Sequence, residues 1–400
     1  MNRLSARMTH LFSTATAAAV ACFGLLAPPA ASAAPAEPPL RFGLSLALTG
    51  EMSAPSNMQK NGYLLWERDI NARGGILNRR VEIVIRDDKG DRATAQQIYK
   101  DLMQRDKVDF LIGPYSSGIT AAVAGIVDKA GYPMLAPGAS ADSIWKNGYT
   151  YIFGIHHHGS RFSRGFLAML ADAGIGKIAI ISTLDDPFAQ DMAIGTARWA
   201  KEYGLQVVLD QKISKSDTNL DAAATAARQS GAEALLMSGQ VNGTINMRRA
   251  LKNINWTPRA YFAALGPVLD KYREVLGPDA EGAFTFSAWE PIEELKLPGS
   301  YEFLQAYRKM YGSEPGYHAA LAYASGQVME RAIQKAGRVD SAAVREELVR
   351  LDADIIVGRY AVDRAGSQTK MATLITQWQG GRRQVVWPLD LRTAAPIIYK

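Results

Sequence analysis

Residues able to hold an anion occur in a loop between a predicted strand and a predicted helix. Residues 113–118 (Gly-Pro-Tyr-Ser-Ser-Gly) follow the predicted strand 108–112 and open a helix that contains Ile119. Serine is a favoured helix N-cap, and the first helical N–H groups lack partners within the helix. With the helix dipole, these groups favour a carboxylate or another anion. Tyr115, Ser116 and Ser117 are therefore candidate ligand contacts, although a serine here could simply cap the helix.

A second loop repeats this pattern. Residues 136–140 (Ala-Pro-Gly-Ala-Ser) follow the predicted strand 133–135, and small residues let backbone N–H and C=O groups approach a ligand closely. Gly138, Ala139 and Ser140 are therefore also candidate contacts.

Further candidates follow strands in the second half of the chain. Phe188 ends the segment Asp-Asp-Pro-Phe after the predicted strand 177–182, and Gln240 and Asn242 follow strand 234–238. Trp289 and Tyr115 could stack on an aromatic ligand or bind a cation. The alternative for Trp289 is packing at a hinge.

Enzymatic and metal-binding motifs are missing from the sequence. There is no Gly-x-Gly-x-x-Gly after a first strand, no phosphate loop, no Gly-x-Ser-x-Gly and no His-Glu-x-x-His. His156, His157 and His158 are consecutive, so in an extended chain they point alternately to opposite sides and do not converge on one ion. We expect no catalytic activity, no metal and no cofactor. One of these histidines could line a cleft and hydrogen-bond an acidic or phenolic ligand.

The elements that would position these residues alternate between strand and helix. Ala95, Ile98, Tyr99, Leu102 and Met103 share one helical face, and the apolar run 178–181 is typical of a strand buried on both sides. This alternation predicts a doubly wound α/β architecture. It breaks at residues 149–164, between two series that could each form a sheet. After residue 291 a long helical region and a hairpin-like tail with a turn at 380–381 are expected. The predicted strands are 42–48, 81–85, 108–112, 133–135, 177–182, 205–209, 234–238, 261–264 and 282–287.

The first residues predict export. Arg3 and Arg7 precede an apolar stretch, 11–26, and Ala-Ser-Ala at 31–33 is a cleavage site, so residues 1–33 are expected to be a signal peptide and the mature chain to be periplasmic. The one cysteine, Cys22, lies in this segment, where lipidation is an alternative. The net charge of +6 falls to +4 when Arg3 and Arg7 are removed, and the basic residues are scattered. Nucleic-acid binding is therefore not expected.

Residues 41–88 carry a family resemblance. A strand, a Thr49-Gly50 loop, a helix, Gly74-Gly75-Ile76 and a second strand follow one another. This order resembles the type I periplasmic solute-binding proteins of ABC transporters, in their leucine/isoleucine/valine-binding branch. The resemblance implies two parallel-sheet lobes joined by a three-strand hinge: residues 40–155 plus 290–366, and residues 156–289 plus 367–400. It also implies a monomer that delivers a solute to the membrane subunits of an ABC permease.

The sequence departs from this family in two places. Phe188 and Ala189 stand where the family usually has Tyr-Gly, and Leu265 stands where amino-acid binders often have an acid that pairs with the ligand ammonium. A buried ammonium without a partner would cost several kcal/mol. Either Asp185, Asp186 or Glu290 replaces that acid, or the ligand has no amine.

The sequence leaves three functions open. The first is a receptor for a carboxylate-bearing solute, by family frequency a branched-chain amino acid and alternatively an aromatic or aliphatic carboxylate without an amine. The second is a free-standing ligand sensor of the same fold. The third is an exported α/β enzyme.

Overall fold

The computed structural model describes residues 37–292 and 295–400. The chain divides into a first unit, Met1–Glu37, of which only Glu37 is described, and a second, compact unit, Pro38–Lys400. Every helix and strand described below belongs to the second unit. The predicted signal peptide, with Cys22, lies outside the described residues. No helix within the described ranges is long and apolar enough to cross a membrane.

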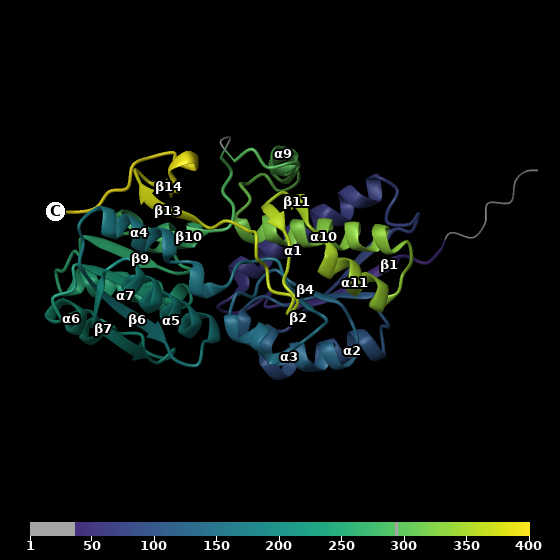
Figure 1. The fold of residues 1–400 in the computed structure, drawn as a ribbon, viewed down its shortest axis with the longest axis horizontal. Coiled ribbons are helices and arrows are strands. Elements are labelled where there is room, and N and C mark those ends of the chain that lie inside the picture. Colours follow the sequence, from purple (N-terminus) through teal and green to yellow (C-terminus); the bar gives the residue numbers. More distant parts are fainter. Residues whose placement is uncertain (1–36, 293–294) are drawn as a thin grey trace, which may run out of the picture. The chain divides into compact units, whose positions relative to one another are not determined.

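The first half of the second unit is built on a five-stranded parallel sheet with the strand order β2-β1-β3-β4-β5. Figure 1 shows this sheet between helices. Helices α2 and α3 cover one face of this sheet, and α1 covers the other. The strands are β1 (Leu40–Leu46), β2 (Val81–Asp87), β3 (Phe110–Ile112), β4 (Met134–Ala136) and β5 (Ile152–Gly154). The helices are α1 (Ser53–Ala72), α2 (Arg92–Gln104) and α3 (Ser117–Lys129), followed by the 3₁₀ turns η1 (Asp142–Asn147) and η2 (Gly159–Arg161).

The second half is built on a seven-stranded sheet with the order β14-β13-β10-β9-β8-β6-β7. Strands β6 to β10 are parallel, and β13 and β14 add an antiparallel hairpin beside β10. The strands are β6 (Lys177–Thr183), β7 (Gln206–Ile213), β8 (Ala234–Ser238), β9 (Ala260–Ala263), β10 (Ala283–Ser287), β13 (Leu374–Gln379) and β14 (Arg382–Trp387). The helical segments are α4 (Arg164–Asp172), α5 (Pro187–Glu202), α6 (Asp221–Gln229), α7 (Val241–Asn253), α8 (Asp270–Leu276) and η3 (Gly277–Ala280).

The parallel parts of the two sheets share one topology. The order β2-β1-β3-β4-β5 in the first sheet corresponds to β7-β6-β8-β9-β10 in the second, which is the doubly wound order with its switch point between the first and third strands. The predicted doubly wound α/β fold is confirmed. The helix face of Ala95, Ile98, Tyr99, Leu102 and Met103 is buried as predicted, and so is the run 178–181.

The strand that follows β4 was not predicted. Strand β5 lies inside residues 149–164, which the sequence pattern assigned to the break between the two series. It has three residues, too few for any periodicity, and it forms because Ile152 and Phe153 pair with Met134 and Leu135 of β4.

The turn predicted at residues 380–381 joins β13 to β14. Gly380 and Gly381 have φ angles of 58° and 77°, which a two-residue type I′ hairpin requires and glycine adopts without steric cost. The other stretch of the predicted tail, 358–366, forms only the short strand β12 (Gly358–Tyr360). This strand pairs with β11 (Ala353–Ile355), which was not predicted, in a separate two-stranded sheet. The last element is η4 (Leu389–Leu391).

After β10 the chain returns to the first sheet. Three helices follow: α9 (Ser300–Tyr311), α10 (Tyr317–Ala336) and α11 (Ser341–Arg350). Helix α10 contacts α1 and β4. The resemblance, and not the periodicity, implied this return. The residue limits proposed for the two lobes remain predictions.

The close packing of α1 on α10 depends on Gly62. A Cβ atom at this position would lie 2.2 Å from the carbonyl oxygen of Ala319 and 2.9 Å from the Cβ atom of Ala322. A backbone atom cannot move aside as the end of a side chain can. A larger residue at position 62 would therefore push α1 away from α10. Helix α10 begins at the binding cavity described below, so this contact helps to position the cavity.

We expect Gly62→Ala to lower the free energy of unfolding by about 1–3 kcal/mol, the usual cost of overpacking. Gly125→Ala is a matched control, because the nearest atom to its new methyl group would be the mobile hydroxyl of Tyr149, at 3.3 Å. Urea denaturation measures both variants. An equal change in the two would contradict the role assigned to Gly62.

Candidate ligand-binding site

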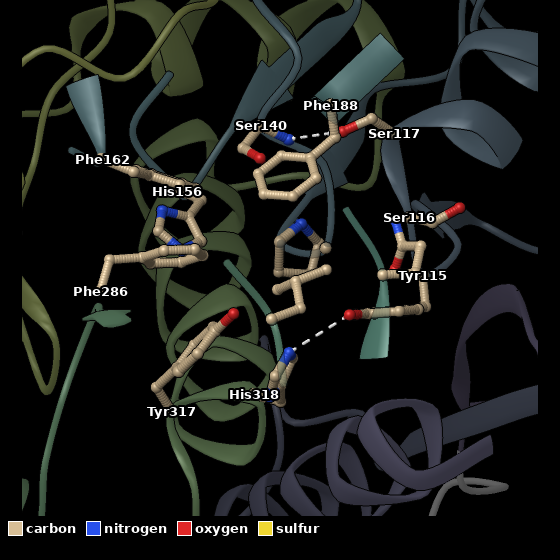
Figure 2. Close-up of a pocket in the computed structure, with 14 residues that line it drawn as sticks. Tyr115, Ser116, Ser117, Ser140, His156, Phe162, Phe188, Phe286, Tyr317 and His318 are labelled. Carbon is tan, nitrogen blue, oxygen red and sulfur yellow. Dashed lines mark hydrogen bonds between the residues drawn. The ribbon is translucent and has the colours of Figure 1, made fainter. Parts of the chain in front are cut away.

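A cavity lies where the carboxyl ends of strands from both sheets meet, the usual place for a ligand in doubly wound folds (Figure 2). The loops after β3, β4, β5, β8 and β9 contribute to it, together with the first turn of α5, the end of β10 and the first turn of α10. The lining residues are Tyr115, Ser116, Ser117, Pro137, Gly138, Ser140, His156, Phe162, Phe188, Gln240, Leu265, Phe286, Tyr317 and His318.

Seven of the ten residues predicted as ligand contacts line this cavity. They share a position in a loop or first helical turn after a strand, as expected from the sequence. They are Tyr115, Ser116, Ser117, Gly138, Ser140, Phe188 and Gln240.

Three predicted residues lie elsewhere. Ala139 is fully buried in the hydrophobic cluster beneath α2 and α3, and Asn242 is exposed on α7. Trp289 faces a separate cavity beside α9, where its indole N–H donates a hydrogen bond of 2.7 Å to the Ser300 hydroxyl. Trp289 therefore does not line the binding cavity, and packing at a hinge, its alternative, stays a prediction. The Thr49-Gly50 loop also does not line the cavity. The Thr49 hydroxyl donates a hydrogen bond of 3.0 Å to Asp87.

Several lining residues were not predicted. Tyr317 and His318 begin α10, and no sequence pattern indicates that this helix returns to the first sheet. Phe162 lies in the segment that joins the two sheets, and nothing in the sequence distinguishes Phe286 from other residues of a buried strand. The expectation that a histidine could line the cleft is met by His156.

The hydroxyl group of Ser117 accepts two hydrogen bonds and, among the described residues, keeps its own proton as a donor. It accepts hydrogen bonds of 3.0 Å from the N–H groups of Ser140 and Ala141. A hydroxyl has two acceptor lone pairs and one donor proton, so both lone pairs are occupied. Its proton remains available to a ligand acceptor, and Ser117 is 2% exposed at the cavity wall. The two loops after β3 and β4 therefore present one oriented donor.

Ser116 adopts a backbone conformation that is unusual for serine. Its φ and ψ angles are 79° and 146°, in a region that glycine normally occupies, and its hydroxyl caps α3 by accepting from the N–H of Ile119 at 3.4 Å. Such a conformation costs of order 1–3 kcal/mol and is found mostly at functional sites. It sets the direction in which the first N–H groups of α3 face the cavity.

Aromatic rings form much of the remaining wall. Phe162 stacks on Phe286 with ring centroids 3.9 Å apart, and Phe188 lies 6.0 Å from Phe162. The ring of His156 lies 4.7 Å from Phe162 and 5.6 Å from that of Tyr317. These distances lie in or near the range for favourable aromatic pairs. This part of the wall therefore offers a flat apolar surface to a ligand.

The lining carries no formally charged side chain. Within the described part of the chain, none of the lining residues is Asp, Glu, Lys or Arg. Helix N-terminal N–H groups and hydroxyls are thus the means by which this wall could hold an anion.

The acidic residues considered as substitutes for Leu265 are engaged elsewhere. Asp186 caps α5 by accepting from the N–H of Phe188 at 3.1 Å, and it accepts from the side-chain amide of Gln240 at 2.7 Å. Burial raises the pKa of Asp186, against the opposing effect of these hydrogen bonds. Glu290 lies 3.5 Å from the Arg383 guanidinium, and Asp185 is exposed. None of the three lines the cavity.

The two lining histidines are neutral at ordinary pH. Burial, with the neighbouring His157 and His318, lowers the pKa of His156 well below its usual value. Burial, with the nearby Arg383 guanidinium, lowers the pKa of His318 to about 3. The Nε2 atom of His318 lies 3.4 Å from the Tyr115 hydroxyl (Figure 2). Neutral imidazoles can both donate and accept hydrogen bonds.

The cavity has a volume of about 20 Å³, which is room for about one water molecule. A solute as large as an amino acid or a benzoate ion does not fit without movement of the walls. Since the walls come from both sheets, entry of such a solute requires them to separate.

The lowered pKa of His318 makes stability depend on pH. The unfolded chain protonates this histidine near pH 6.5 and the folded protein only near pH 3, so its contribution is fully present above pH 6.5 and is lost as the pH falls toward 3. Between pH 6.5 and pH 3, this histidine lowers the free energy of unfolding by up to about 1.4 kcal/mol for each unit by which the pH falls. Because glutamine does not titrate, we expect His318→Gln to remove this part of the pH dependence. Urea denaturation from pH 7 to pH 4 measures it, and an unchanged slope would contradict the assignment.

Comparison with known proteins identifies the family of this chain. Residues 39–383 match the model of a periplasmic binding protein family. The Leu/Ile/Val-binding protein homolog 7 of Brucella suis is 24% identical, with 90% of this chain and 94% of the relative covered. The isoleucine complex of LivJ from Streptococcus pneumoniae has a TM-score of 0.79 at 23% identity, covering 88% of this chain and 100% of that one. A solute-binding protein from R. palustris, solved with benzoate, has a TM-score of 0.75 at 19% identity, covering 90% and 98%. The chain therefore belongs to a periplasmic binding protein family, and it is similar over most of its length to Leu/Ile/Val-binding protein homologues and shares the fold of LivJ.

Proposed function

We propose that this protein is an exported receptor that binds a small carboxylate without an ammonium group between its two sheets and delivers it to an ABC permease. The observation that carries this proposal is the chemistry of the cavity wall. The wall offers an oriented hydroxyl proton from Ser117 and no acidic side chain within the described lining.

The carboxylate would lie against the first turn of α3. Ser117 can donate its hydroxyl proton there, and the N-terminus of the helix favours negative charge. Hydrogen bonds to a charged group contribute about 1.5–3 kcal/mol each. Two or three of them, with the burial of apolar area, are sufficient in scale for micromolar binding, about −8.2 kcal/mol.

An ammonium group would find no ionic partner in this cavity. Leu265 lines the wall where the family resemblance leads us to expect an acid, and Asp186 already caps α5 and accepts from Gln240. Uncompensated burial of the charge would cost several kcal/mol. A carboxylate lacking an amine avoids that cost.

The rings of Phe162, Phe188 and Phe286 favour an aromatic body for the ligand. The R. palustris neighbour was solved with benzoate, which is consistent with this preference, whereas LivJ was solved with isoleucine. A branched-chain amino acid is therefore the second candidate, supported by the names of the Brucella relatives.

Delivery would follow from closure of the two walls on the solute. A ligand that contacts both walls stabilises the closed state over the open one, and a permease could recognise that state. The expected signal peptide would place the receptor in the periplasm, and we propose that it acts as a monomer there.

A ligand panel with one variant tests the proposal. We expect benzoate to raise the melting temperature, and benzamide, leucine and isoleucine to leave it unchanged, because the site requires a carboxylate and cannot pair an ammonium. Ser117→Ala should weaken benzoate binding roughly tenfold or more in calorimetry, the scale of one charged hydrogen bond. Ser230→Ala is the control, because the Ser230 hydroxyl donates to the Ala227 carbonyl, away from the cavity.

Stabilisation by leucine or isoleucine but not by benzoate would contradict the proposed ligand class and favour the second candidate. Equal effects of Ser117→Ala and Ser230→Ala would contradict the role of the Ser117 proton.

A further inference from the structure

His156 is a buried polar side chain at the cavity that lacks hydrogen-bond partners. It is 5% exposed, and within the described residues neither of its ring nitrogens has a hydrogen-bond partner. Its ring is surrounded by Phe162, Phe286 and Tyr317, with centroids at 4.7, 6.1 and 5.6 Å. Unpaired buried polar groups are unfavourable, so such a group is expected to meet a partner when the site is filled.

A second polar group shares this wall. In Figure 2 the hydroxyl of Tyr317 points into the cavity beside His156, on the side away from Ser116. The two residues come from different elements, His156 from the segment after β5 and Tyr317 from the first turn of α10. A ligand whose carboxylate lies at the first turn of α3 would direct its opposite end toward them.

We infer that His156 and Tyr317 form a subsite for a hydroxyl group on the ligand, so that the preferred solute is a hydroxy-substituted aromatic carboxylate. This inference rests on the proposed function. A hydroxyl both donates and accepts, so it can pair with either nitrogen of a neutral imidazole and with the phenol of Tyr317. A second carboxylate would find no cationic side chain there, because the described lining holds none.

Calorimetry with four ligands tests the inference: benzoate, 3-hydroxybenzoate, 4-hydroxybenzoate and 4-methoxybenzoate. We expect at least one hydroxybenzoate to bind the unmodified protein tenfold or more tightly than benzoate. The methoxy compound, which cannot donate, should lose most of that advantage. His156→Phe should weaken the preferred hydroxybenzoate at least fivefold more than benzoate, and Tyr317→Phe should act in the same direction.

His157→Phe is the matched control, because His157 is buried next to His156 but does not line the cavity. This variant should keep the preference. If His156→Phe does not fold, His156→Leu replaces it, and the ligand series on the unmodified protein stands without either variant.

Two outcomes overturn the inference while leaving the proposed function intact. One is benzoate binding as tightly as both hydroxybenzoates. The other is an equal loss for both ligand types in the His156 variant, which would mean that the ring only fills space. Failure of all four carboxylates to bind would instead overturn the proposed function and the inference with it.

Discussion

The proposed site depends on the hydrogen bond that the Ser117 hydroxyl can donate to a ligand. Two backbone N–H groups, those of Ser140 and Ala141, occupy the acceptor positions of the oxygen, so the loops after β3 and β4 hold each other and aim one donor at the cavity. A hydroxyl without such commitments could turn to accept or donate and would discriminate less between ligands. The strained backbone of Ser116 belongs to the same arrangement, because it places the first turn of α3 against this wall.

The two sheets repeat one topology, and loops and strand ends of both sheets line the cavity. Each sheet presents the carboxyl ends of its strands at a switch point. The first sheet contributes the serines of its loops, and the second contributes Phe188, Leu265 and Phe286. Helix α10 belongs to the packing of the first sheet but brings Tyr317 and His318 to the aromatic side. A ligand that contacts every wall must therefore hold both sheets together.

Sequence reasoning recovered the parts of this site that have local causes. Ser116, Ser117 and Ser140 were found because strand-to-helix loops have a recognisable composition. Phe188 was found because the family resemblance places an aromatic residue at this position. Tyr317, Phe162 and Phe286 were missed because their position depends on long-range packing, which periodicity does not encode. Trp289 was proposed as a ligand contact on its chemistry alone, and its indole is instead bonded to Ser300 beside α9. Strand β5 was missed because three residues carry no period.

A crystal structure of the protein with benzoate tests the central claim most directly. We expect one carboxylate oxygen to lie about 2.5–2.8 Å from the Ser117 hydroxyl oxygen, as in a charge-assisted hydrogen bond, with the ring between Phe162 and Phe188. A carboxylate that instead pairs with a lysine or arginine side chain, with Ser117 out of contact, would contradict the role of the Ser117 proton.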